Sequence, residues 1–210
     1  MKHVKMLGLA AVAACAMMAI AGVGTASAAG ALCSTATNPC TSKWATGTAI
    51  DFSLKSGTTA KLVDTSNNTL DSCTTSTVKG TLEKNAGGAA SAEGKIGELT
   101  WGVGGSCTVT TDTILPGGLK IDSNGAGTGK VSSNAKIEVT VNVFSSCNYG
   151  VESGAPLGTT SEGIGTGVVF TANAVAKKLN GGFLCPETTK WTGTYVLTTP
   201  SNTTFYVSTS

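Results

Sequence analysis

The stretch Lys136-Ile-Glu-Val-Thr-Val-Asn-Val-Phe-Ser-Ser-Cys147 determines the fold class that we expect for this chain. Residues 137, 139, 141 and 143 are apolar, whereas residues 138, 140 and 142 are polar. An alternation with period two gives an extended segment one apolar and one polar face, which is typical of a β-strand lying on a core. The stretch runs into a cysteine. We therefore expect strands gathered around this one and held by disulfides.

Similar alternating segments recur along the chain, and Gly, Pro and Asn separate them at intervals of about 8–12 residues. Near the C-terminus, Trp191, Tyr195 and Leu197 share one face of such a segment, so we assign them to the core. Asn124-Gly125 is a strong signal for a hairpin with a type I′ turn. Residues 171–179 are compatible with a short helix or a strand. The pattern predicts an all-β fold, an antiparallel β-sandwich or barrel.

The N-terminal 28 residues have the organisation of an export signal. A basic start precedes an apolar segment, and the small residues Ala26-Ser27-Ala28 match the A-x-A pattern of a signal cleavage site. We expect cleavage after Ala28. Cys15 also fits a short lipoprotein pattern, but the segment remains apolar beyond it, which favours loss of Cys15 with the signal.

Charge argues against binding to nucleic acid. All 14 basic residues are lysines, and removal of residues 1–28 leaves 12 lysines, 12 acidic residues and no histidine. A neutral chain without arginine lacks the basic surface that binds phosphate backbones, and no run of lysines suggests attraction to anionic lipid.

Six cysteines remain after removal of the signal, which indicates an oxidising compartment and three disulfides. Six cysteines allow 15 connectivities. Their spacing favours a short loop around Asn38-Pro39 and two longer loops. The pairs that we expect are Cys33–Cys40, Cys73–Cys107 and Cys147–Cys185.

The domain organisation has two interpretations. In the first, residues 29–42 form an N-terminal arm with a short Cys loop, and residues 43–210 form one all-β domain. In the second, residues 43–115 and 119–210 form two small β units on either side of Pro116-Gly117-Gly118. The two longer Cys intervals resemble each other in layout, which suggests an internal duplication.

Catalytic chemistry has little support in the sequence. Without histidine, a Ser-His-Asp triad, a Cys-His pair and His-bound metal are excluded in the processed chain, and bonded cysteines offer no thiol nucleophile. We expect no catalytic residue, no metal and no cofactor. A glycosidase that uses two carboxylates remains an alternative, because twelve acidic residues are present.

Sugar binding would need exposed aromatic rings on which a pyranose can stack. Trp44, Trp101 and Tyr149 are the candidates outside the segment that we assign to the core. Because the chain has few aromatic residues, the core competes for the same side chains.

Two motifs in the second half of the chain support a resemblance. They are Phe144-Ser-Ser-Cys-Asn-Tyr-Gly150 and Phe183-Leu-Cys-Pro186, the latter followed by Trp191 and Tyr195. With the export signal and the Thr/Gly-rich body, they resemble uncharacterised exported, disulfide-containing proteins of actinobacteria. The resemblance implies export and an all-β class, and it implies no activity and no site residue.

We therefore expect a secreted or cell-envelope structural or binding protein that is not an enzyme. Its expected partner is a cell-wall or extracellular polysaccharide or a protein, with no membrane span after signal removal. A carbohydrate-binding protein is one alternative. A surface-fibre subunit is another, because a terminal strand at residues 203–208 would permit strand exchange.

Overall fold

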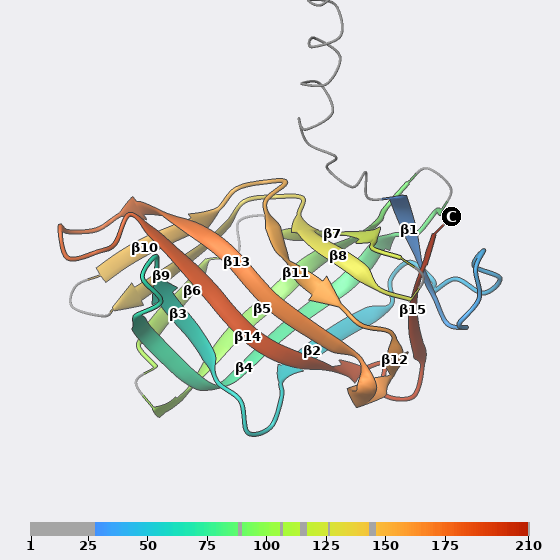
Figure 1. Ribbon diagram of the computed structural model, residues 1–210, viewed down its shortest axis with the longest axis horizontal. Coiled ribbons are helices and arrows are strands. Elements are labelled where there is room, and N and C mark those ends of the chain that lie inside the picture. The colour runs from blue at the N-terminus through green and yellow to red at the C-terminus, as the bar shows by residue number, and fades with distance from the viewer. Residues whose placement is uncertain are drawn as a thin grey trace, which may run out of the picture.

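The computed structural model describes residues 28–87, 90–105, 107–113, 117–125, 127–142 and 146–209. In these ranges the chain is nearly all antiparallel β-sheet, as predicted, and contains no α-helix (Figure 1). No helix in this part of the chain is long and apolar enough to cross a membrane. The elements are β1 Ala28–Cys33, β2 Ala49–Leu54, β3 Ala60–Asp64, β4 Thr69–Lys84, β5 Ala92–Gly105, β6 Val109–Thr113, β7 Gly118–Ser123, β8 Gly129–Ser133, β9 Ile137–Asn142, β10 Ser146–Val151, β11 Pro156–Thr160, β12 Gly163–Ile164, the 3₁₀ turn η1 Gly165–Gly167, β13 Val169–Asn180, β14 Thr188–Thr199 and β15 Thr204–Thr209.

Four long strands, β4, β5, β13 and β14, run the length of the molecule (Figure 1). At one end, shorter strands join them into a closed ring of hydrogen-bonded neighbours, in the order β7–β5–β4–β2–β14–β13–β11–β8 and back to β7. A sheet that closes on itself is a barrel. Of the two architectures expected from the sequence, the structure therefore has the barrel.

At the other end, a second set of short strands continues the wall. Strand β3 takes the place of β2 between β4 and β14, and β10, β9 and β6 extend the sheet from β13. No ladder between β6 and β5 is present among the described residues, so this half of the ring stays open there. The Cys73–Cys107 disulfide links β4 to the segment that precedes β6.

The stretch at 136–147 behaves only partly as expected. Val141 is buried, and Ile137 and Val139 pack against the core from β9, so the alternation is confirmed for these positions. The strand ends at Asn142, and Cys147 belongs to the next strand, β10, where it faces Val141. Residues 143–145 lie outside the described residues. Strand β9 also lies near the end of the sheet order rather than at its centre, because a local pattern predicts a buried face but not the neighbours of a strand.

Two further local expectations are corrected. Residues 171–179 are part of β13, which pairs with β10, β11 and β14, so the helical alternative is wrong. The hairpin at Asn124-Gly125 exists between β7 and β8, but its turn is longer than a type I′ turn. The Asn124 amide donates to the Thr128 carbonyl, and of the two predicted turn residues only Gly125 has a positive φ, 106°.

The three expected disulfides are present, namely Cys33–Cys40, Cys73–Cys107 and Cys147–Cys185. Six bonded cysteines are consistent with an oxidising, extracellular location. Most of the predicted signal lies in residues 1–27, outside the described residues, and so does Cys15, whose loss with the signal and whose alternative lipidation both stay untested.

Both predicted segments of the processed chain contribute to one sheet. Strand β1, from the expected N-terminal arm, pairs with β7 and with β15 at the C-terminus. The ladders β2–β14, β3–β14 and β5–β7 join residues 43–115 to residues 119–210. Residues 43–115 and 119–210 therefore share one sheet. An ancient duplication stays a prediction.

Candidate functional site: an apolar cavity in the barrel

A cavity of about 110 Å³ lies inside the barrel, between the long strands and the strands β3, β9 and β10. Every described residue in its wall is aliphatic or aromatic. A second cavity of about 50 Å³ continues toward the β2 and β8 end and shares wall residues with the first, including Val78, Ile96, Leu119 and Phe170. The two spaces therefore adjoin each other along the inside of the barrel.

A row of alanines on β13 accounts for the space. Ala172, Ala174 and Ala176 are buried, line the larger cavity and alternate with outward-facing residues. Native cores are normally packed with few voids larger than a water molecule. Three successive small side chains, set against large ones across the barrel, leave the volume that a Leu or Val would otherwise fill.

Register places an aromatic wall beside the alanines. Trp191 on β14 is opposite Ala174, and it packs edge-on against Trp101 of β5, with ring centroids 5.0 Å apart at 77°. The Trp191 Nε1–H donates to the Tyr195 hydroxyl at 3.2 Å, and that oxygen lies 3.1 Å from the Ser76 hydroxyl. Trp191 is therefore held in one orientation, which makes this side of the cavity rigid.

The same contacts explain the state of Tyr195. Burial raises the pKa of its hydroxyl above the ordinary value, and the hydrogen bonds with Ser76 and Trp191 oppose that rise. The ring of Tyr195 occupies space left by Gly193, since a Cβ at Gly193 would lie 2.8 Å from the ring atom Cε2. Glycine at position 193 therefore leaves room for the Tyr195 ring in the cavity wall.

Two polar groups in the walls lack a hydrogen-bond partner among the described residues. They are the indole Nε1–H of Trp101, in the larger cavity wall, and the hydroxyl of Thr160, in the smaller one. Buried polar groups are usually satisfied, and leaving one unpaired costs about 1–3 kcal/mol. A ligand oxygen placed against either group would satisfy it.

The aromatic residues expected to stack on sugars do not form a surface platform. Trp44 is only 5 % exposed, donates from Nε1 to the Thr204 carbonyl at 3.1 Å and packs edge-on against Phe205, so it is a core residue. Tyr149 is 1 % exposed, and burial followed by the charge of Glu187 raises its pKa. Trp101 alone lines a cavity, and it does so from inside the barrel. The assignment of Trp191 and Tyr195 to the core is confirmed.

Acidic residues are absent from the walls of both apolar cavities as far as the structure describes them. Two hollows on the outer surface are lined mainly by Lys, Thr, Asn and Gly, with Asp122 as the one carboxylate and no aromatic ring among their described residues. Neither hollow therefore offers the pair of carboxylates used by glycosidases, or a stacking platform.

One group of residues has the spacing of a metal site but other partners. Ligand atoms of Asp71, Cys73 and Cys107 lie within 4.8 Å of one another. The two sulfurs are bonded to each other, and the Asp71 carboxylate accepts hydrogen bonds from the Thr108 amide and hydroxyl at 3.0 and 3.1 Å. This buried carboxylate therefore anchors the segment after Cys107, which is a structural role.

The alanine row is the signal that could have predicted the cavity. The sequence Ala172-Asn-Ala-Val-Ala176 alternates small inward residues with larger outward ones. The chain matches no protein-family model, no curated protein and no solved structure. Inferences about function therefore depend on the site itself.

Proposed function

We propose that this chain is an exported binding protein that holds a small, uncharged apolar molecule inside its barrel and performs no catalysis. The observation that carries the proposal is the all-apolar cavity between the alanine row of β13 and the Trp101–Trp191 pair. The three disulfides support the extracellular part of the proposal, because such bonds persist in oxidising compartments.

The cavity volume indicates the ligand class. An apolar cavity of about 150 Å³ engineered into another protein stays dry and binds benzene or xenon. A space of about 110 Å³ is of the same order, and the adjoining 50 Å³ extends it. A short aliphatic chain or a small ring fits this size. Burial contributes about 0.8 kcal/mol to binding per methylene, so affinity should rise with each methylene that the cavity accommodates.

The other functions considered have less support. Carbohydrate binding by stacking would need ring faces that Trp44 and Tyr149 do not present. Strand exchange at the C-terminus would need a free edge on β15. That strand pairs with β1 on one side, and on the other it pairs with β12 and exchanges hydrogen bonds between Val207 and Gly127.

A series of straight-chain alcohols from butanol to decanol tests the proposal. Two of the three tryptophans, Trp101 and Trp191, line the cavity, so tryptophan emission reports its occupation. We expect affinity to rise about fourfold per methylene and then level off when the cavity is full. Short cell-wall oligosaccharides are the matched polar probes. Binding of the sugars with no response to the alcohols would overturn the proposal in favour of carbohydrate binding.

A further inference from the structure

The loop between β13 and β14 carries an exposed apolar tip, which consists of Phe183 and Leu184. Phe183 is 94 % exposed and Leu184 is 51 % exposed. Val175 and Leu179 are also exposed, on the outer side of β13, and Lys177 lies between them. The hairpin reaches the left end of the molecule in Figure 1, so the tip is a projection and not a groove. Large apolar side chains in such positions commonly mark an interaction surface.

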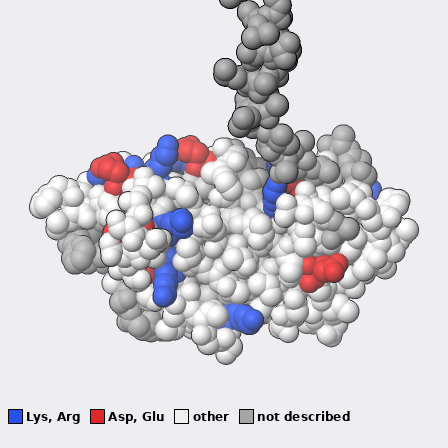
Figure 2. Space-filling model, viewed as in Figure 1, with Lys and Arg blue, Asp and Glu red and all other residues white. Residues whose placement is uncertain are grey.

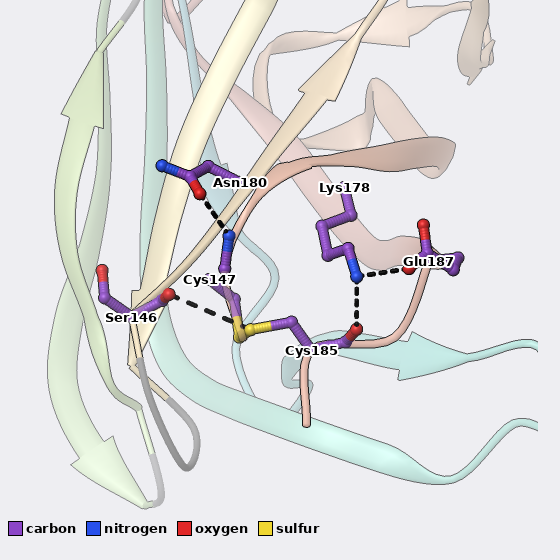
Figure 3. A network of polar contacts seen from close by, with 7 residues as sticks. Ser146, Cys147, Lys178, Asn180, Cys185 and Glu187 are labelled. Atoms are coloured by element: carbon purple, nitrogen blue, oxygen red, sulfur yellow. Dashed lines mark hydrogen bonds and ion pairs between the residues drawn. A yellow bond between two sulfur atoms is a disulfide. The ribbon is translucent and has the colours of Figure 1, made fainter. Parts of the chain in front are cut away.

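The tip is held in place by covalent and polar contacts (Figure 3). The Cys147–Cys185 disulfide joins the loop to β10. The Lys178 ammonium donates to the Cys185 carbonyl at 3.4 Å and forms an ion pair with Glu187. At the start of the loop, the Asn180 side chain accepts a hydrogen bond of 2.8 Å from the Gly181 amide. These contacts fix a shape that exposes Phe183 before any partner is bound.

Three lysines form a row beside the tip, on the outer faces of β3, β14 and β13. The register places Lys190 opposite Val175, Lys177 opposite Thr188 and Lys61 opposite Thr192. Lys190 is therefore a diagonal neighbour of both Lys177 and Lys61, about 7–8 Å from each. Figure 2 shows lysine side chains close together over β3 and β14.

This lysine row has little nearby compensation. None of its three members forms an ion pair with a described residue. Of the acidic residues close by, Glu187 is paired with Lys178, and Asp64 accepts hydrogen bonds from Ser66 and Asn68 in its own turn. The surface behind the tip is therefore locally positive, although the processed chain as a whole is neutral.

We propose that the Phe183–Leu184 tip and the lysine row dock the protein on the surface of an anionic lipid layer. The rings and aliphatic groups of the tip enter the apolar boundary, and the lysines face the anionic headgroups. A projecting apolar tip beside a row of lysines is better suited to a deformable, negatively charged lipid surface than to a rigid groove in a protein partner. The inference stands on the tip and the lysines, and does not require the cavity to be occupied.

Sedimentation with vesicles tests this proposal, using secreted, processed protein so that the apolar signal is absent. The vesicles are made of phosphatidylcholine with and without phosphatidylglycerol. We expect binding that requires the anionic lipid and weakens with salt. The double substitution Phe183→Ser with Leu184→Ser lowers partitioning at least tenfold, and Lys177→Gln with Lys190→Gln lowers it about tenfold or more on anionic vesicles only.

Ile164→Ser is the matched control, because Ile164 is 62 % exposed on β12 and lies away from the tip. It should leave partitioning unchanged. Equal binding by all variants, or no binding to anionic vesicles, overturns the proposal. Light scattering provides a further outcome that overturns it. If the original protein is a dimer and the Phe183→Ser, Leu184→Ser variant is a monomer, the tip binds a second copy of the chain and not a lipid surface. The alcohol series is repeated on the same variant. Unchanged affinity for the alcohols shows that the cavity is intact, so failure of the lipid proposal is distinguished from failure of the cavity proposal.

Discussion

Substitution of Ala174 by leucine tests whether the cavity is an empty, ligand-accessible space. Ala174 is buried and lies opposite Trp191, so an added isobutyl group would project into the cavity. Residual cavities cost about 24 cal/mol per Å³, which for 110 Å³ is at most about 2.6 kcal/mol. Ordering the leucine side chain costs about 0.5–1 kcal/mol. We therefore expect Ala174→Leu to stabilise the fold by about 1.5–2 kcal/mol.

The assay combines two readings on the same protein. Urea unfolding should show a higher midpoint with an unchanged slope. The alcohol titration should lose most of its response, because the leucine occupies the space of the ligand. Asn173→Leu is the matched control, since residue 173 points outward from the same strand and should change neither reading.

The reasoning would be refuted by an Ala174→Leu variant that binds the alcohols as tightly as the original protein. A variant that is destabilised by more than about 1 kcal/mol would show that the space is too narrow for added methylenes, as in an overpacked core. Ala174→Val then repeats the test with a smaller side chain.

Three further predictions concern the parts of the fold that surround the site. Removal of the Cys147–Cys185 bridge by a double Cys→Ala substitution should lower the free energy of unfolding by about 4 kcal/mol, from the loop of 38 residues that it closes; chemical denaturation measures this, and a loss below about 1 kcal/mol would contradict the estimate. Gly158→Ala should lower the free energy of unfolding by about 2 kcal/mol or more, because at a φ of 153° its Cβ would lie 2.1 Å from the Thr171 carbonyl oxygen across the β11–β13 ladder. Gly154→Ala is the control, because Gly154 also has a positive φ but a Cβ there meets nothing within 4 Å. Equal losses of stability in the two variants would argue against the contact with Thr171. The raised pKa of Tyr195 means that the folded state keeps this proton to higher pH than the unfolded state, so its contribution to stability is complete below about pH 10 and is lost as pH rises further; Tyr195→Phe should flatten this alkaline loss in denaturation curves, and an equally steep loss in that variant would contradict the assignment.

Local patterns in the sequence predicted the class of the fold and the inward faces of several strands. Apolar residues alternate with polar ones at Val139 and Val141 and again around Trp191, Tyr195 and Leu197. Such an alternation can be read from residues adjacent in sequence, and it predicts which face of a strand is buried. The disulfide pairs were predictable because each bond joins two cysteines that are consecutive in the sequence of the processed chain. The order of strands was not predictable in this way. Strand β14 pairs with both β2 and β3 on one side, and such a division depends on the whole sheet.

The site was less accessible from sequence than the fold. Ala172, Ala174 and Ala176 create a cavity only because the register sets them beside Trp191 and across the barrel from Trp101. The same alanines in a closely packed sheet would fill a narrow space without leaving a void. Trp44 and Tyr149 show the opposite case, since composition alone does not separate exposed rings from buried ones.

The tip at Phe183 also depends on long-range structure. In sequence, Phe183-Leu-Cys-Pro186 resembles a short core segment, because two apolar residues precede a bonded cysteine. The bridge to Cys147 on β10 instead holds the loop at the end of the barrel, where Phe183 has no core to enter. The lysine row was invisible for a similar reason, since Lys61 and Lys190 come together only through the β3–β14 ladder.

Diffraction from crystals pressurised with xenon tests the central claim most directly, because xenon binds in dry apolar cavities of this size. We expect a single strong xenon peak inside the barrel, between Ala174, Trp101 and Trp191. Ordered water at that position, or side chains repacked to fill it, would contradict the proposal that the barrel holds an apolar ligand.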